Sequence, residues 1–244
     1  MRLSKRIYAI CEHVNTGETI ADIGTDHGYV PMLLVKNKIS PKAIMCDISA
    51  DSLSKAQETF RELNLPCSED SFRVGDGLKP LEKGEVDDII IAGLGGHTIS
   101  DILAFDLDKS RSYSKIIMQP RKHSGNLRYF LYVNGFDIIQ ESLVPEGKFI
   151  CEIITAVPTE ITERKPIWDE DDIRWKYPQA FESLDRECVT KRLLWKINSI
   201  DEELQNLQKS SKDEQSINAM TDKLQQDRKY LAQLLERNSH NEKA

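Results

Sequence analysis

The first half of the chain alternates helical patterns with short apolar runs. Leu3, Ile7, Ile10 and Val14 repeat at steps of four and three residues, which predicts an amphipathic helix that ends before Asn15. Runs typical of buried strands follow at residues 19–23, 43–47, 72–74, 88–92 and 115–118. Helical patterns lie between most of them, at residues 29–35, 53–63, 98–103 and 125–133. This alternation predicts an α/β fold with a mainly parallel sheet.

Two further strands are expected after the last of these helices. Residues 136–143 and 149–157 are rich in apolar side chains and flank the turn-forming sequence Pro145-Glu146-Gly147. A hairpin at this point would complete a seven-stranded sheet. In known sheets that this pattern resembles, the last strand runs antiparallel to its neighbours and lies beside the fifth strand.

The C-terminal third has a different pattern. Residues 158–178 contain three prolines and a cluster of acids, which is typical of a linker. Beyond them, two arms repeat apolar residues at steps of three and four, and the polar stretch 208–216 separates the arms. This predicts an antiparallel helical hairpin or short coiled coil. Asp227 at a seam position disfavours a long dimeric coil.

Two roles remain open for this helical tail. It could serve only stability or dimerisation. Alternatively, its basic side chains could line an edge that faces nucleic acid: Lys191, Arg192, Lys196, Lys223, Arg228 and Lys229. A separate basic group, Arg2, Lys5 and Arg6, lies at the start of the N-terminal helix, where cations are unfavourable for the helix dipole. A solvated helix face is the ordinary explanation of such a short cluster, and a phosphate contact is the sharper one.

Composition limits the classes of protein that fit. The net charge of −7 disfavours a non-specific nucleic-acid coat, so any nucleic-acid site must be a local basic patch. The five cysteines are scattered and never form a C-x-x-C pair, which argues against a disulfide framework and a zinc site. No apolar run approaches the length of about 18 residues that a membrane span needs, and no secretory signal is recognisable. We therefore expect a cytoplasmic protein without a metal.

The most informative stretch is the turn after the first strand, which reads D-x-G-x-D-x-G from Asp22 to Gly28. A glycine turn between a strand and a helix lets backbone N–H groups approach a nucleotide-like ligand. Here Asp26 replaces the second glycine of a pyrophosphate-binding turn, and two carboxylates would repel a phosphate. They suit a ligand with a cationic ammonium and sulfonium, which is S-adenosylmethionine (SAM).

Other polar residues follow the ends of the later strands. Asp47 lies 19 residues beyond Gly28, at about the spacing of the acid that binds ribose hydroxyls in nucleotide-binding α/β domains. Asp76, between Gly75 and Gly77, could reach an adenine amino group, although a surface turn is an equally ordinary explanation. Residues 93–96 expose bare backbone after the fourth strand, and Pro120 directs Gln119 outward after the fifth.

Together these motifs resemble a bacterial family, the SAM-dependent tRNA (adenine(22)-N1)-methyltransferases. The resemblance covers about residues 2–156 and rests on A-D-I-G-T-D-H-G-Y-V-P from Ala21, C-D-I from Cys46, R-V-G-D-G-L from Arg73, I-I-I-A-G-L-G-G from Ile89, I-M-Q-P from Ile117 and E-G-K-F-I-C-E-I-I from Glu146. It implies a class I methyltransferase domain with a Rossmann-like seven-stranded sheet over residues 1–160 and a helical coiled-coil domain over residues 161–244. The implied reaction is methylation of an adenine in the D-arm of tRNA, and we expect a monomer.

The resemblance also assigns parts of the cofactor to residues. The methionine part of SAM would lie against the turn formed by Asp22, Gly24, Thr25, Asp26, His27 and Gly28. The ribose and adenine would contact Asp47, Ile48, Asp76 and Gly77, and the floor beneath the methyl would be Ala92 and Gly93. This chain departs from the family pattern at Leu94, Arg121 and Cys151, where methionine, asparagine and tyrosine are frequent. The Arg121 departure bears on how the Gln119-Pro120 turn would contact the base.

N1 of adenine carries a lone pair, so no strong base is needed, and positioning behind the methyl can supply much of the rate. The ring becomes cationic, which makes Asp26 the first candidate for a stabilising carboxylate. His27 is a candidate proton shuttle or base contact, although it could equally be a structural histidine, and Gln119 is a candidate positioner of the base. Two alternatives remain: a small-molecule methyltransferase of the same fold, and a non-catalytic RNA-binding protein.

Overall fold

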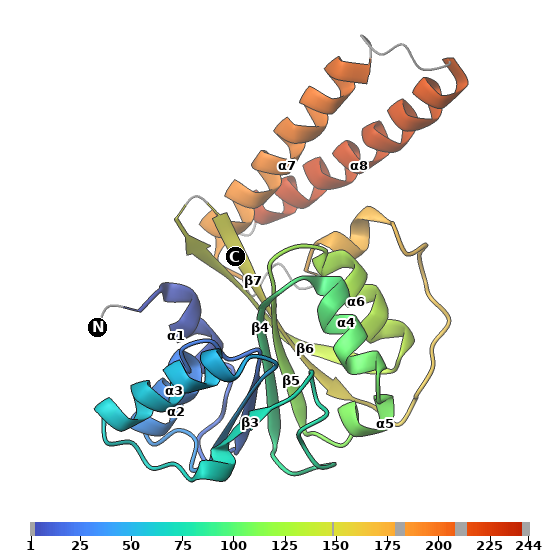
Figure 1. The fold of residues 1–244 in the computed structure, drawn as a ribbon. Coiled ribbons are helices and arrows are strands. Elements are labelled where there is room, and N and C mark those ends of the chain that lie inside the picture. Colours follow the sequence, from blue (N-terminus) through green and yellow to red (C-terminus); the bar gives the residue numbers. More distant parts are fainter. Residues whose placement is uncertain (1–2, 148, 179–183, 208–213, 241–244) are drawn as a thin grey trace. The chain divides into compact units, whose positions relative to one another are not determined.

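The structure is a computed structural model that describes residues 3–147, 149–178, 184–207 and 214–240 (Figure 1). It divides into two compact units, Met1–Pro178 and Gln179–Ala244. The strands of the first unit are β1 (Ile20–Ile23), β2 (Ala43–Asp47), β3 (Phe72–Val74), β4 (Asp88–Leu94), β5 (Lys115–Pro120), β6 (Phe136–Glu146) and β7 (Phe149–Pro158). Its helices are α1 (Lys5–Cys11), α2 (Tyr29–Lys36), α3 (Ala50–Glu62), α4 (Gly96–Ala104), α5 (Leu107–Ser110) and α6 (Ser124–Val133), with short 3₁₀ turns η1 (Glu69–Ser71) and η2 (Ile173–Lys176).

The seven strands form one sheet in the order β3-β2-β1-β4-β5-β7-β6. The pairs from β3 to β5 are parallel, and β7 is antiparallel to both β5 and β6. The predicted Rossmann-like sheet with an inserted antiparallel strand is therefore confirmed. Since β1 to β5 are parallel, their carboxyl ends meet at one edge of the sheet.

Helices cover both faces of this sheet (Figure 1). Ile10, Leu34 and Phe60 of α1, α2 and α3 pack in one core cluster, while residues of α4 and α6 pack in another on the opposite face. The continuous apolar run of β4 serves both clusters, because Ile89 and Ile91 point to one face and Ile90 to the other. Burial on both faces explains why this strand shows no polar alternation.

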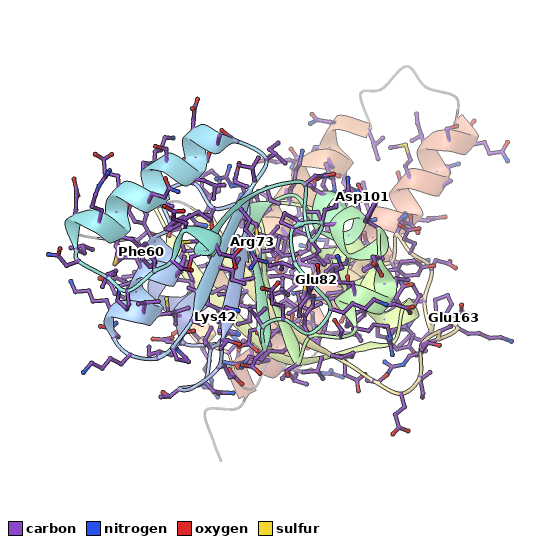
Figure 2. All side chains as sticks on the ribbon, turned by 60° about the horizontal axis from the view of Figure 1, so that its bottom comes forward. Lys42, Phe60, Arg73, Glu82, Asp101 and Glu163 are labelled. Carbon is purple, nitrogen blue, oxygen red and sulfur yellow. The ribbon has the colours of Figure 1, made fainter. Side chains whose placement is uncertain are left out.

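The edge strand β3 is short and is held by charge. Arg73, which is labelled in Figure 2, forms an ion pair with Glu85 at 2.7 Å, and this pair ties β3 to the loop before β4. Phe72 packs edge-on against Phe60 of α3, with ring centroids 5.9 Å apart. These contacts fix the third strand although it has only three residues.

The amino ends of the parallel strands lie on the side of the sheet opposite to their carboxyl ends, and we call this side the amino edge. It holds a cluster of charged residues, which we call the amino-edge cluster: Glu18, Asp88 and Lys115. Lys115 Nζ lies 2.5 Å from Glu18 Oε2 and 3.3 Å from Asp88 Oδ2. Burial raises the pKa of Asp88 to about 8. Burial also opposes ionisation of Glu18, but its hydrogen bonds, first that from Lys115, lower its pKa to about 2. At neutral pH the cluster is thus one ion pair beside a protonated acid.

Residues 158–178, which the sequence pattern assigns to a linker, lie within the first compact unit. Trp175 of η2 is buried, and its ring packs against Tyr129, Tyr132 and Trp168. Its carbonyl accepts a hydrogen bond from Arg128, which is also buried. Residues 160–172 are mostly exposed, but the end of the segment is anchored, so the segment belongs to the first unit. Aromatic side chains anchor this segment on α6, and the two units divide after Pro178.

The second unit contains α7 (Arg186–Leu207) and α8 (Glu214–His240), which pack as the predicted helical hairpin. The seam buries apolar residues from both helices, namely Leu193, Ile197, Ile200, Leu207, Leu231 and Leu234. Arg228 pairs with Asp201 at 2.6 Å, and the Asn238 amide donates to Thr190 Oγ1 at 2.9 Å. Of the expected polar connection at 208–216, residues 208–213 lie outside the described residues, whereas residues 214–216 belong to the first turn of α8. Over the described ranges, no helix has the length and apolar character of a membrane span.

Candidate functional site

The backbone of the β1–α2 turn is held tightly against the next strand. The N–H groups of Gly24 and Thr25 both donate to the carbonyl of Cys46, at 2.8 and 3.1 Å. Gly24 and Gly28 have φ of +78° and +66°, a region that favours glycine. A Cβ on Gly28 would lie 3.0 Å from that of Ala56 on α3. The glycine spacing therefore serves both the left-handed turn and the close packing of α3.

Asp22, at the end of β1, is the buried acid of this turn. Its carboxylate accepts a hydrogen bond from the Thr25 hydroxyl, which also donates to the Asp22 carbonyl at 3.2 Å. The pKa of Asp22 is raised to about 6. Burial is the main cause and the charge of Asp47 adds to it, whereas the hydrogen bond from Thr25 acts in the opposite direction. A cation next to Asp22 would favour its ionised form.

Asp26 and His27 lie farther out on the same turn. The Asp26 side chain is 58% exposed, and Oδ1 accepts a hydrogen bond from Lys55 Nζ at 2.8 Å. This bond lowers the pKa of Asp26, so its carboxylate is ionised at neutral pH. His27 Nε2 is 3.4 Å from Asp26 Oδ2, and its ring stacks on Tyr29 with centroids 5.1 Å apart. Sequence reasoning missed Lys55, because its position on α3 is that of an ordinary solvent-facing lysine.

The ends of β2 and β3 place two more predicted residues at this edge. Asp47 Oδ1 accepts a hydrogen bond from Ser49 N at 2.7 Å, and its carbonyl accepts one from Gly75 N at 2.9 Å. Ile48, between them, is 74% exposed. An exposed apolar side chain beside a fixed carboxylate can provide an apolar surface next to a hydrogen-bond acceptor.

Asp76 follows β3 and is exposed. Its Oδ2 lies 2.6 Å from Lys79 Nζ. Gly77 has φ of +56°, and a Cβ there would approach Ile102 of α4 to 3.1 Å. Gly77 is therefore required by backbone conformation and by packing, whatever its role toward a ligand.

The end of β4 opens into bare backbone. The pairing with β5 shifts register between Ala92 and Leu94, and Gly93 has φ of +80°. Gly96 is packed so closely that a Cβ would lie 2.1 Å from the carbonyl oxygen of His123. This explains the glycine-rich run at the exit of β4, since two of its positions exclude a side chain.

Gln119 lies at the end of β5 and is 1% exposed. Its Oε1 accepts a hydrogen bond from Arg6 Nη1 at 2.9 Å, and its Nε2 donates to the Pro120 carbonyl at 3.1 Å. Arg6 also approaches Glu146 at the end of β6, with Nε 3.7 Å from Oε1. Arg6 of α1 therefore fixes the amide of Gln119. The sequence pattern indicated a partner contact for the N-terminal basic group, but it did not predict the contact between Arg6 and Gln119 of β5.

Two of the positions that depart from the family pattern lie near Arg6. Burial raises the pKa of the Cys151 thiol, and the charges of Arg6 and Arg121 oppose this rise. Arg121 and Arg6 also both approach Gly93. Cys151 and Arg121 therefore share one environment at the exits of β4, β5 and β6.

The predicted site residues all lie on the carboxyl edge, on five adjacent strand ends. They form two groups. The first group surrounds the β1–α2 turn and the ends of β2 and β3, and includes Asp22, Asp26 and Asp47. The second lies at the ends of β4 and β5 and includes Gly93 and Gln119. Asp26 and Gln119 belong to different groups, because β4 separates β1 from β5.

Known proteins are similar to this chain in sequence and in fold. The model of a family described as "Methyltransferase domain" matches residues 3–154. The tRNA (adenine(22)-N(1))-methyltransferase of Bacillus subtilis is 35% identical over 156 residues, which are 64% of this chain and 65% of that enzyme. The aligned part thus spans slightly less than two thirds of the B. subtilis enzyme. A putative tRNA methyltransferase of Mycoplasma genitalium is 28% identical over 193 residues, 78% of this chain and 84% of that protein.

Solved structures are similar over nearly the whole chain. The crystal structure of the B. subtilis m1A22 tRNA methyltransferase has a TM-score of 0.74 and 25% identity, and the comparison covers 96% of this chain and 99% of that one. An uncharacterised protein from Listeria monocytogenes has a TM-score of 0.79 and 25% identity, with coverage of 96% and 100%.

Proposed function

Because this chain belongs to the methyltransferase-domain family, we propose that it transfers the methyl group of SAM to N1 of an adenine at position 22 of bacterial tRNA. The observation that carries the proposal is the 35% identity to the B. subtilis enzyme of that activity, joined to the clustering of the predicted residues at the carboxyl edge. A tRNA substrate would place the protein in the cytoplasm, and we expect it to act as a monomer.

The β1–α2 turn fits the methionine part of SAM. Asp22 is a buried acid, and burial raises its pKa to about 6. A cationic ammonium next to Asp22 would therefore stabilise the ionised carboxylate. Gly24 and Gly28 have no side chains that would keep a ligand away from the backbone at these two positions. Thr25 orients the Asp22 carboxylate through its hydroxyl.

The ends of β2 and β3 fit the adenosine part. Ser49 holds one oxygen of Asp47, and the carboxylate would accept hydrogen bonds from the ribose hydroxyls. Ile48 would pack on the adenine ring. Asp76 would accept a hydrogen bond from the adenine amino group, and this bond would replace part of the contact between Asp76 and Lys79.

When bound, SAM supplies an electrophilic methyl group. The residues of the chain must then hold N1 of adenine in line and exclude water. Ala92 and Gly93 would let the base approach the backbone at the end of β4. Gln119, which Arg6 holds by a hydrogen bond, would lie beside the base. The target base must leave its stack in tRNA, at a cost of a few kcal/mol.

Asp26 would stabilise the positive charge that develops on the adenine ring. Its pKa is already lowered by the hydrogen bond from Lys55, so it would not need to release a proton first. Lys55 partly neutralises this carboxylate, so binding of a cationic ring would compete with the Lys55 contact. His27, which is stacked on Tyr29, would accept the excess proton or contact the base.

The alternatives are less well supported. A small-molecule methyltransferase would share the sheet but gives no reason for the helical hairpin of α7 and α8. A non-catalytic RNA-binding protein gives no reason for the buried acid and the glycine turn around it. Both predict that no 1-methyladenosine forms in tRNA.

The proposal is tested by incubating the full chain with SAM and an unmodified tRNA transcript that carries adenine at position 22. Nucleoside mass spectrometry should detect about one 1-methyladenosine per tRNA. A transcript with guanine at position 22 is the matched control and should remain unmodified. Absence of 1-methyladenosine in the first transcript, with SAM binding intact, would refute the assigned substrate.

Asp26→Asn tests the role of the carboxylate. We expect a fall in kcat of about 100-fold, with the Kd of SAM within twofold of wild type, because charge stabilisation is lost and the shape is kept. Asp108→Asn is the control, since Asp108 of α5 is 86% exposed and lies outside the site. Turnover by Asp26→Asn at the rate of the control would remove Asp26 from the mechanism.

A further inference from the structure

Two guanidinium groups converge at the exit of β4. A Cβ built on Gly93 would lie 3.6 Å from Arg121 Nη2 and 3.9 Å from Arg6 Nη1, so both groups approach the same point above bare backbone. Arg6 comes from α1 and Arg121 from the end of β5, so residues far apart in sequence meet here. Like charges brought this close repel each other, and an anion between them removes that cost.

The loop that carries Arg121 is held in place by backbone hydrogen bonds. Arg121 N donates to the Leu94 carbonyl at 2.8 Å, and Gly96 N donates to the Lys122 carbonyl at 2.8 Å. The Lys122 side chain crosses Gly95, with Cε 3.6 Å from the position of a Cβ there. The exits of β4 and β5 therefore form one fixed platform with a basic side chain on each of two successive residues.

The acids nearby compensate only part of this charge. Glu146 approaches Arg6, with Oε2 accepting from Arg6 N at 3.4 Å. Glu152 of β7 is engaged elsewhere, by the buried Arg128 and by Ser124. Within the described ranges, Arg121 takes part in no ion pair, and this residue is exposed. The β4–β5 exit is therefore locally positive on a chain whose net charge is −7.

We propose that Arg6 and Arg121 bind an RNA backbone phosphate next to the target nucleotide, with Lys122 contacting the following phosphate. This rests on the proposed function and names the part of the substrate that this surface holds. A planar guanidinium can donate two parallel hydrogen bonds to one phosphate. Because Gly93 lies at the floor assigned to the methyl group, a phosphate held by these arginines would fix the RNA backbone next to a base turned toward that methyl.

Arg6 also contacts a residue of the proposed base site. One of its nitrogens holds Gln119 Oε1, so the same side chain would contact the phosphate and the amide that borders the base. Binding of the RNA backbone and orientation of Gln119 would thus be linked through Arg6. Among the described residues, Arg121 makes no hydrogen bond to Gln119. Replacing Arg121 therefore tests the phosphate contact without removing the hydrogen bond that holds Gln119.

The test compares Arg121→Gln with Arg61→Gln in the full chain. Arg61 is an exposed arginine near the end of α3, away from the carboxyl edge, so both variants lose one surface guanidinium. For Arg121→Gln we expect the KM for the tRNA transcript to rise about tenfold and the slope of log affinity against log salt to fall by about one. The Kd of SAM should stay within twofold. Arg61→Gln should match wild type, and Arg121→Lys should recover most of the salt slope.

Each outcome decides between explanations. Equal KM values for Arg121→Gln and Arg61→Gln would overturn the proposal, as would a tenfold loss of SAM affinity in Arg121→Gln, which would assign the cluster to the carboxylate of SAM instead. If wild type forms no 1-methyladenosine, the proposed function fails. In that case direct binding of the transcript, measured by fluorescence anisotropy at two salt concentrations, still tests the phosphate contact.

Discussion

The two edges of the parallel sheet use charged residues differently. At the amino edge, Asp88 and Lys115 are buried and Glu18 is half-buried, and Lys115, only 7% exposed, pairs with both acids. At the carboxyl edge, Asp26, Asp76 and Arg121 are exposed, and the acids there pair with single lysines at the surface. Exposed pairs are easily exchanged for ligand contacts, whereas a buried pair is costly to break. The amino edge therefore stabilises the fold, and the carboxyl edge is available for binding.

The largest expected effect is at the amino edge. Lys115→Met would leave the Glu18 carboxylate without its cation, and we expect a loss of about 3 kcal/mol in the free energy of unfolding. Urea denaturation at pH 7 measures this loss. The carboxyl-edge counterpart, Lys79→Met, removes an exposed lysine and should leave the urea midpoint nearly unchanged. Equal midpoints for the two variants would contradict the division between the edges.

The next effect is on ligand binding. Asp22→Asn should weaken SAM binding about 30-fold at pH 7.5, because a charge-assisted contact with the ammonium is lost. The wild-type affinity should also fall as the pH drops from about 7.5 to 5.5, since the pKa of Asp22 is about 6, and that of Asp22→Asn should not. Isothermal titration calorimetry measures both.

Asp88→Asn is the matched control for this experiment. The chemical change is the same, but it lies at the amino edge, where Asp88 is protonated at neutral pH because its pKa is about 8. We expect SAM affinity equal to wild type. A comparable loss of affinity in both variants would mean that the effect at Asp22 is structural.

A smaller effect concerns pH and stability. His13 is buried between α1 and the β6–β7 pair, with Nδ1 2.6 Å from Thr155 Oγ1 and Nε2 2.8 Å from Ser142 Oγ. Burial, with help from Lys115, lowers its pKa from 6.5 to about 4. The neutral ring is favoured in the folded state, so its contribution is complete above pH 6.5 and is lost as the pH falls toward 4. Between pH 7.5 and 5 the loss should be about 2 kcal/mol.

His13→Gln isolates this contribution. The variant keeps hydrogen-bonding capacity but does not titrate, so the difference in unfolding free energy between wild type and variant should shrink by that amount over the same interval. A pH-independent difference would show that His13 titrates normally in the folded protein.

Much of the fold followed from the sequence for a clear physical reason. Strands such as 43–47 and 72–74 were predicted with the bounds that the structure gives, because turns and prolines delimit short apolar runs. The segment 158–178 was harder to interpret. Its prolines and acids are typical of a linker, but Trp175 and its aromatic neighbours anchor it on α6, and such tertiary packing leaves no local periodicity.

The site shows the same limit. Acids and glycines at strand ends could be found, since parallel strands bring their carboxyl ends together. Their partners could not, because Lys55 and Arg6 come from helices distant in sequence and show only ordinary surface patterns. Gln119 was expected to point outward, and it is instead buried and held by Arg6. The roles of the site residues remain predictions that the variants above test.

Hydrogen–deuterium exchange with and without SAM tests the central claim most directly, because it reports both edges in one experiment. We predict slower exchange in residues 24–28 and 47–49 when SAM is added, with residues 84–88 and 113–115 unchanged. Protection confined to 84–88 and 113–115, or equal protection at both edges, would contradict the assignment of the carboxyl edge as the SAM site.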